Sequence, residues 1–334
     1  ADMSTSNTPQ KSTGISSLYI VKCICAFLVV TCHTPMGQVK EIISPIAMAA
    51  VPIFFLISGY FLYSPDERKS YERAKKSLKK IVPIFLLVQL FYWAWLLPNH
   101  GNLLNSWRGL ADIFLTGSLF SGHLWYLTAM LHGLLVLGLF FRMKWGRWLW
   151  CFLPLHILAL LGGRYSFLIT DDGQPAYLFY VYNSICYTFT FMSAGYLIAK
   201  YEHRLTHFKH WGILLLALCL LGIGERFALN AVGFGYANGP FLSCGFIAIA
   251  TLCWALSHKS LGSNTLGERI GSKYTGNIYY FHIAVATIVE KAFTLAGGFE
   301  LYHLLGSVFV FLATIPVAYV IVRVQERLGW QVLR

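Results

Sequence analysis

The chain alternates between long apolar runs and shorter polar segments. Ten runs are apolar enough to be candidate membrane-spanning helices, and the shorter ones need interfacial residues to approach the ~20 residues of a full span. They lie near residues 16–34, 43–63, 82–97, 122–141, 147–162, 178–199, 211–227, 239–257, 276–296 and 302–323. The pattern predicts an all-α, polytopic membrane protein with about ten transmembrane helices. An even number of spans places both termini on the same side of the membrane.

One transmembrane domain is predicted over residues 16–325. A Ser/Thr-rich N-terminal tail at 1–15, expected to be disordered, precedes it, and a short C-terminal tail at 326–334 follows. Ala1 and Asp2 stand before Met3 and resemble residues left from expression. The first apolar run contains Lys22 and has no small-residue cleavage motif after it, so we expect a retained helix and not a signal peptide.

Small residues occur at matching places in two predicted helices. The segments FLISGYFL (55–62) and FMSAGYLI (191–198) resemble each other faintly. We interpret both as sites of close helix packing and not as an internal repeat. The predicted helix at 178–199 is also rich in Tyr and Phe, which indicates either a cavity wall for a sugar or aromatic packing.

Composition supports the membrane class. Hydrophobic residues make up 57% of the chain, charged residues 12%, and the mean hydropathy is +0.59; soluble proteins carry ~25% charged residues. A soluble globular protein is therefore excluded. The 8 Cys lie mostly within apolar runs, which predicts buried thiols instead of a disulfide framework. No CxxC or HExxH motif occurs, so no metal site is expected.

The basic residues predict the orientation. Of 26 Lys and Arg residues, 20 fall in the N-terminal tail, the C-terminal tail and the segments near 64–81, 142–146, 200–210 and 258–275, and 5 fall in the alternate segments; the remaining one is Lys22, within the first run. Short cytoplasmic loops carry the excess of Lys and Arg, so both termini are predicted to be cytoplasmic. The net charge of +12 then follows from topology, and we expect the lipid bilayer, not nucleic acid, as the partner.

The segment at 64–81, expected to be a loop, is the densest basic stretch. It includes Arg73, Lys79 and Lys80 and leads into an apolar run. One interpretation is a topology determinant that touches anionic lipid. The other is a phosphate site that holds a polyphosphate ligand at the cytoplasmic face.

Two ionisable residues lie within or at the end of the first apolar run. Lys22 and His33 are eleven residues apart, which is ~1100° of helical rotation, about 20° past three turns, and ~16 Å along the axis. They therefore share one helix face, and an ionisable residue inside a span usually faces a protein interior or a wet cavity. Alternatively, Lys22 extends to the headgroups and His33 lies at an interfacial turn before Pro35.

Further candidates occur in later runs. The motif GHLWYL opens the fourth run and places His123 and Trp125 at about the depth of His33, although an aromatic belt at the interface would also explain them. The motif IYYFH ends at His282, predicted to lie in the inner half of the ninth span. Arg323 lies near the cytoplasmic end of the last run.

These motifs, in this order, resemble the acyltransferase 3 family of integral-membrane acyltransferases. Lys22-x10-His33 is similar to the Arg-x10-His motif of that family, and PIFFLISGYFL (52–62) to its FF-x-x-SG-[FY] helix. The basic segment that ends IVP (81–83), HLWYL (123–127) and IYYFH (278–282) resemble its later elements. The chain departs from the family in having Tyr19 where Asp is usual and Lys22 where Arg is commoner. No SGNH-type esterase domain follows the tenth run, so transfer is expected to finish within the membrane domain or on an external acceptor.

The resemblance implies a function in the bacterial cytoplasmic membrane. An acyl group would move from cytoplasmic acyl-CoA, with acetyl-CoA as the expected donor and no metal, to a hydroxyl of a cell-surface glycan or glycolipid. His33 would act as general base, or less favourably as a covalent acyl carrier, and His123 or Trp125 would stabilise the oxyanion. The residues that would bind the donor are Lys22, Ser58, Arg73, Lys79, Lys80, His282 and Arg323. The protein could form a homo-oligomer.

Two other functions stay open at this point: a polysaccharide or lipid-glycan exporter or flippase, and a sensory or scaffold domain.

Overall fold

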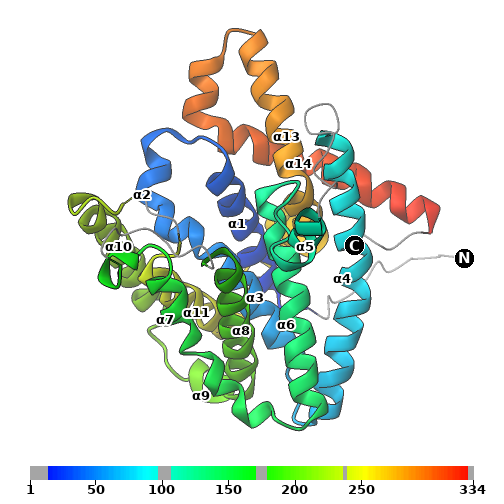
Figure 1. Ribbon diagram of the computed structural model, residues 1–334, viewed down its shortest axis with the longest axis vertical. Helices are drawn as coiled ribbons and strands as arrows, with labels where there is room; N and C mark the ends of the chain where they lie inside the picture. The colour runs from blue at the N-terminus through cyan, green and yellow to red at the C-terminus, as the bar shows by residue number, and fades with distance from the viewer. Residues whose placement is uncertain (1–13, 97–106, 171–178, 236–238, 330–334) are drawn as a thin grey trace, which may run out of the picture.

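The computed structural model describes residues 14–96, 107–170, 179–235 and 239–329, and all regular structure in these ranges is helical (Figure 1). The α-helices are α1 (Ser16–His33), α2 (Gly37–Met48), α3 (Ala50–Leu62), α4 (Glu67–Leu96), α5 (Trp107–Leu115), α6 (Trp125–Arg142), α7 (Leu155–Leu161), α8 (Phe179–Lys200), α9 (Glu202–Thr206), α10 (Trp211–Ala231), α11 (Leu242–Ser257), α12 (Leu266–Lys273), α13 (Thr275–Leu295) and α14 (Phe299–Leu328). Short 3-10 helices occur at η1 (Gly122–Leu124), η2 (Gly146–Phe152) and η3 (Ser166–Leu168). The all-α prediction is confirmed. The predicted N-terminal tail lies almost entirely outside the described residues.

Seven helical segments in the described part of the chain are long and apolar enough to cross a membrane. They are Ser16–His33, Gly37–Leu62, Glu67–Leu96, Gly122–Arg142, Trp211–Ala231, Thr275–Leu295 and Phe299–Leu328. The chain is a multi-pass membrane protein, as predicted; its described residues contain seven such segments, whereas ten were predicted over the whole sequence. The orientation of its termini stays a prediction.

The predicted span at 147–162 is not a single helix. Pro154 separates η2 from α7, and α7 ends where Gly162 and Gly163 follow. Proline removes one backbone donor and glycine weakens a helix, so this apolar run forms two short pieces. The run at 43–63 is also divided, between α2 and α3 at Ala49. Pro52 cannot donate to the carbonyl of Met48, which lies four residues earlier.

The basic segment at 64–81 is helical from Glu67 on and not a loop, which corrects the sequence prediction. Helix α4 begins at Glu67, and the Asp66 carboxylate accepts a hydrogen bond from the Arg68 amide at 2.9 Å. Such a side-chain cap starts a helix, and Glu, Lys, Arg, Ala and Leu continue it well. The basic side chains therefore project from a rigid helix that runs directly into its apolar half.

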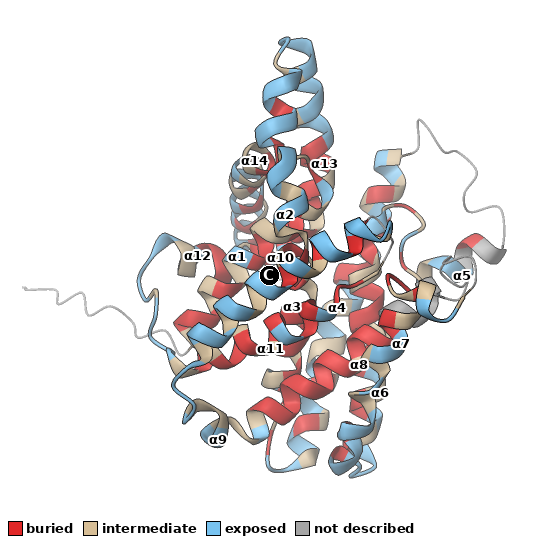
Figure 2. Ribbon diagram, turned by 90° about the vertical axis from the view of Figure 1, so that its left-hand side faces the viewer, coloured by how far each residue is buried: buried red, intermediate tan, exposed pale blue. Residues whose placement is uncertain are grey.

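Helix α1 lies at the centre of the helical assembly. It contacts α2, α3, α11, α12, α13 and α14. The buried residues gather on the central helices, whereas the outer faces are exposed (Figure 2). Helix α10 at the edge exposes apolar side chains such as Ile213 and Leu221, as a lipid-facing helix would.

Helices α3 and α8 pack through their glycines. A Cβ atom on Gly59 would overlap the carbonyl oxygen of Met192, and one on Gly195 would overlap that of Leu56. The two backbones are therefore in direct contact, as small residues allow. The interpretation of both small-residue segments as packing sites is confirmed.

Candidate active site

His33 is the last residue of α1, and its position is held from two sides. Thr34 is extended, as expected before Pro35, and its hydroxyl donates to the Val30 carbonyl at 2.7 Å. The Pro35 carbonyl accepts hydrogen bonds from the amide and the hydroxyl of Ser307 in α14, at 2.9 and 3.0 Å. The end of α1 is thereby fixed to α14, and His33 is fixed with it.

Three histidines from different elements meet at this point. The ring centroids of His33 and His282 are 5.2 Å apart, those of His33 and His123 are 6.2 Å apart, and those of His123 and His282 are 5.0 Å apart. His123 and His282 are buried, whereas His33 is exposed to a cavity. The sequence predicted His33 and His123 at a common depth, and the structure adds His282 to the cluster.

Hydrogen bonds orient the two buried rings. His282 Nδ1 lies 2.8 Å from the Tyr279 carbonyl oxygen, and His123 Nδ1 lies 2.8 Å from the Ser121 hydroxyl. A carbonyl only accepts, so His282 carries its proton on Nδ1 and leaves a lone pair on Nε2. In the described part of the structure the Nε2 atoms of both rings have no hydrogen-bond partner. His282 therefore offers an unused proton acceptor beside His33.

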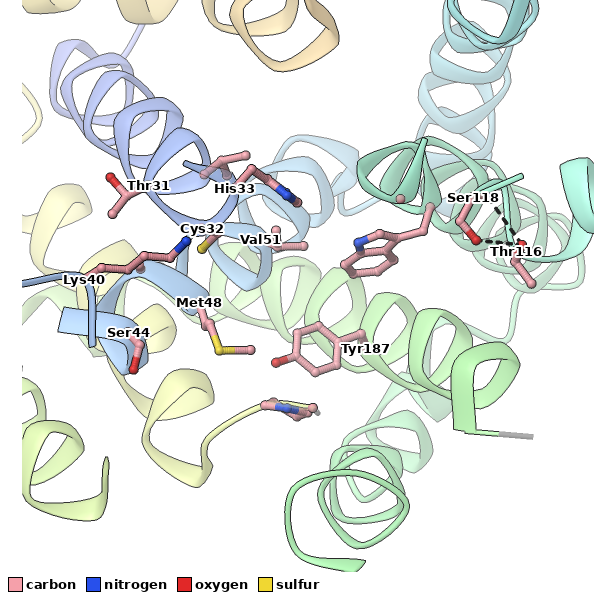
Figure 3. A pocket seen from close by; sticks show the side chains of 16 residues that line it. Thr31, Cys32, His33, Lys40, Ser44, Met48, Val51, Thr116, Ser118 and Tyr187 are labelled. Carbon is pink, nitrogen blue, oxygen red and sulfur yellow. Dashed lines mark hydrogen bonds between the residues drawn. The ribbon is translucent and has the colours of Figure 1, made fainter. Parts of the chain in front are cut away.

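The cavity to which His33 is exposed has a volume of about 690 Å³, and we call it the His33 cavity. Figure 3 shows His33, Cys32 and Lys40 on the side formed by α1 and α2, with Tyr187 and Ser118 across from them. Its lining is Val29, Thr31, Cys32, His33, Lys40, Ser44, Ala47, Met48, Val51, Thr116, Ser118, Gly122, Trp125, Tyr187, Gly239 and Pro240. Its size and its mixture of apolar and hydroxyl groups are typical of a small-molecule site.

Buried arginine side chains support the wall of the His33 cavity behind Gly239. Arg164 is 5% exposed, and its guanidinium donates to the carbonyls of Gly235 and Gly239 at 2.6 and 3.1 Å. Burial lowers the pKa of Arg164 to about 10, so it remains protonated at neutral pH. Arg226 bonds the same Gly235 carbonyl and forms an ion pair with Glu41 at 3.2 Å. These contacts hold the Gly239 side of the cavity in place.

A second cavity of about 350 Å³ lies along α1 on the side of Lys22, and we call it the Lys22 cavity. It carries the ammonium groups of Lys22, Lys80 and Lys273 and the hydroxyls of Ser58 and Ser77. No carboxylate belongs to the described lining, so the cavity has a positive potential. Polar residues from α1, α3, α4 and α12 converge there, which suits a polyanionic ligand.

The two cavities share Val29 and Val51 in their linings. Val29 lies one helical turn before His33 on α1, and Val51 lies at the start of α3. The partition between the cavities is therefore about one side chain thick, and His33 lies next to it. A group that reaches the end of the Lys22 cavity comes within reach of a molecule in the His33 cavity.

Four of the predicted site residues occupy these cavities besides His33. Lys22, Ser58 and Lys80 line the Lys22 cavity, and Trp125 lines the His33 cavity with its ring 6.5 Å from that of Tyr187. The structure brings His123 and His282 to His33, so it places His282 in the cluster and not in the lining of the Lys22 cavity.

Arg73, Lys79 and Arg323 are not part of either lining. Arg73 donates to the carbonyls of Phe61 and Tyr63 at the end of α3. Lys79 is exposed on α4. Arg323 lies on α14, where it pairs with Glu326 at 3.4 Å.

Four residues of the two cavities were not predicted from the sequence: Lys40, Lys273, Val29 and Val51. In the sequence, Lys40 and Lys273 contribute only to the charge difference between segments, and nothing in their spacing links them to Lys22 or His33. They reach the cavities only because α2 folds back on α1 and α12 packs against it. Tertiary packing, which a single sequence does not display, supplies them.

Comparisons with known proteins give a curated relative and a family match. A serine/alanine racemase of Enterococcus gallinarum is 27% identical to this chain over 215 residues, which is 58% of this chain and 30% of that protein. The matched region thus spans about a third of that relative. No solved structure matches the chain. The family model described as an acyltransferase domain matches residues 15–323 and so includes α1, both cavities and all three histidines; the chain belongs to the acyltransferase 3 family.

Proposed function

We propose that this protein transfers an acyl group, with acetyl-CoA as the donor, from the cytoplasmic side to a hydroxyl of a glycan or glycolipid at the outer side. The observation that carries the proposal is the position of His33 at the thin partition between two cavities. Family membership supports acyl transfer. The positive Lys22 cavity supports a CoA donor, and its ammonium groups would hold phosphates.

The Lys22 cavity is small for a whole CoA molecule. Its volume of about 350 Å³ is at the low end for ligand sites, so it holds the pantetheine arm and the thioester. The nucleotide lies at the cavity mouth, where Lys80 and Lys273 bind its phosphates and Lys79 adds positive charge on α4. Lys22 neutralises the phosphate nearest to the arm.

The chemistry takes place at His33. Its imidazole accepts the proton of the acceptor hydroxyl while the hydroxyl oxygen attacks the thioester carbonyl. The tetrahedral intermediate then loses the CoA thiolate, which takes up a proton and leaves as the thiol. His282 stabilises the protonated His33 ring through its unused Nε2 atom, and His123 does the same in the tautomer that donates from Nδ1 to the Ser121 hydroxyl. The indole N–H of Trp125 donates to the oxyanion.

The test combines donor binding with turnover. Purified protein in liposomes should bind acetyl-CoA, and cells that express the chain should show surface glycan heavier by one acyl group. His33→Ala should keep acetyl-CoA binding and lower transfer by about 10²–10⁴-fold, the usual contribution of a general base. A matched control is Cys32→Ala, which changes the neighbouring cavity residue and should keep most of the activity.

Two outcomes would contradict the proposal. Transfer at the parent rate by the His33→Ala protein would move the base to His123 or His282. Absence of both acetyl-CoA binding and added glycan mass would instead favour a glycan exporter, for which cavities that meet at a thin partition are also suitable. The relative in Enterococcus gallinarum is named a racemase, but the matched region covers only 30% of it, and we do not assign racemisation to this chain.

A further inference from the structure

Lys40 is the single Lys, Arg, Asp or Glu side chain in the described lining of the His33 cavity. It is half-buried and lies close enough to His33 and Cys32 to interact electrostatically with both (Figure 3). Its ammonium donates to the Thr34 carbonyl at 3.0 Å. An ammonium group has three hydrogens, so this bond leaves two for another acceptor.

Carboxylates around this cavity are engaged elsewhere. Glu41, the next residue in the chain, forms its ion pair with Arg226. Glu225 accepts hydrogen bonds from the backbone amides of Leu242 and Ser243. Within the ranges that the structure describes, no carboxylate lies within 4.0 Å of Lys40 Nζ. The cavity therefore has a net positive charge on the side of Lys40.

The bond to Thr34 alone does not account for a lysine here. A cation near the end of α1 favours its terminal carbonyls, but a neutral donor of shorter reach would satisfy the same oxygen without placing a charge in a half-buried cavity. Charged groups in such places are normally paired. The missing partner is expected to be an anion that enters the cavity.

We propose that Lys40 binds an anionic group of the acceptor, a carboxylate or a phosphate, and so turns the acceptor hydroxyl toward His33. This inference rests on the proposed function and names its acceptor class as an acidic sugar. Trp125 and Tyr187 provide flat aromatic faces for a sugar ring, and Ser44 and Ser118 provide hydroxyls for its polar edge. A volume of about 690 Å³ accommodates more than one sugar residue.

Calorimetry on the purified full chain, without acyl-CoA, tests the inference independently of turnover. The probes are methyl glucuronoside and glucose 1-phosphate, each compared with neutral methyl glucoside at equal ionic strength. The parent should bind one anionic probe, or both, more tightly than the neutral one. Lys40→Gln should weaken anion binding by about tenfold or more and leave neutral binding unchanged, because one charge-assisted hydrogen bond is lost.

Two further variants separate charge from structure. Lys40→Arg keeps the charge and should retain the preference for the anion, whereas Lys291→Gln removes an exposed lysine of α13 outside the cavity and should change nothing. Equal weakening of all three probes by Lys40→Gln would show that Lys40 only holds Thr34, and would overturn the inference. Parent protein with no preference for an anionic probe would overturn it as well.

The same probes distinguish a failure of the proposed function. If anion binding depends on Lys40 but no probe is acylated from acetyl-CoA and no CoA thiol is released, acyl transfer to this class fails while the anion site stands. If all probes are acylated equally by the parent and by Lys40→Gln, acyl transfer stands and the acidic acceptor is excluded. Preference for glucuronoside over phosphate, or the reverse, identifies which anion Lys40 binds.

Discussion

At the scale of single residues, the helical period explains part of the site. Lys22 and His33 share a face because eleven residues make almost three whole turns, and the structure places one in each cavity. His282 was predicted at a different depth from His33, but the packing of α13 on α1 brings their rings together. Contacts within one helix can be read from the sequence, whereas contacts between helices depend on packing geometry.

Cationic residues of the Lys22 cavity should differ in their effect on donor binding. Lys80→Gln should weaken acetyl-CoA binding by roughly tenfold, because Lys80 lines the cavity and is proposed to bind a donor phosphate. Lys22→Ala should do the same, and Lys22→Arg should be tolerated because it keeps the charge. Isothermal titration at two salt concentrations measures both effects, since added salt screens exposed charges.

Two control variants match this series: one lies on α4 beside Lys80, and the other lies on α14, away from both cavities. Lys79→Gln, one residue away on α4 but outside the lining, should have a smaller effect than Lys80→Gln. Arg323→Gln should have none, because that side chain pairs with Glu326 away from both cavities. Equal effects of Lys79→Gln and Lys80→Gln would mean that the phosphates bind the surface of α4 and not the cavity.

At the scale of elements, apolar runs predicted which segments are helical, and proline and glycine decided where they break. The run at 147–162 is interrupted at Pro154, which separates η2 from α7. The charge of the basic segment at 64–81 predicts a loop, yet its residues from Glu67 on are strong helix formers with a cap at Asp66. Polarity indicates exposure, but it does not by itself indicate a loop.

The contact between α3 and α8 should tolerate no added methyl group. Gly59→Ala and Gly195→Ala should each destabilise the protein by about 1–3 kcal/mol or more, because the new Cβ meets a backbone carbonyl that cannot move aside. Gly224→Ala in α10 is the matched control: a Cβ there meets no atom within 4 Å, so stability should be kept or improved. Thermal unfolding in detergent compares the three; unchanged stability of both α3–α8 variants would show that these helices separate readily.

At the scale of the whole molecule, the charge bias predicts which end faces the cytoplasm. Helix α9 lies at one end, and the turn between α13 and α14 lies at the other (Figure 1). The proposed donor and acceptor sides depend on this orientation. The predicted assignment places Lys209, which follows α9, inside and Glu300, at the start of α14, outside.

Labelling with a membrane-impermeant maleimide should confirm this orientation. Glu300→Cys should react in intact cells and Lys209→Cys only after lysis, both in a background in which the exposed Cys151 is replaced by Ser. The Cys151→Ser protein without an added cysteine is the control for the remaining native thiols. Reaction of Lys209→Cys in intact cells would reverse the orientation and exchange the two sides of the proposed reaction.

The partition formed by Val29 and Val51 has a consequence for the membrane as an insulator. Cells maintain an ion gradient across this membrane, and a wet passage through the protein would dissipate it. In the proposed reaction, the two apolar side chains between the cavities would keep water from forming a continuous file, while only the acyl carbon has to come within bonding distance of the acceptor. The size of these two side chains then affects both the acyl length and the barrier to protons. Smaller side chains would admit longer acyl groups, but they would also let protons pass. If acyl transfer proceeds as proposed, the need to conserve the ion gradient limits the length of the acyl group as much as the shape of the site does.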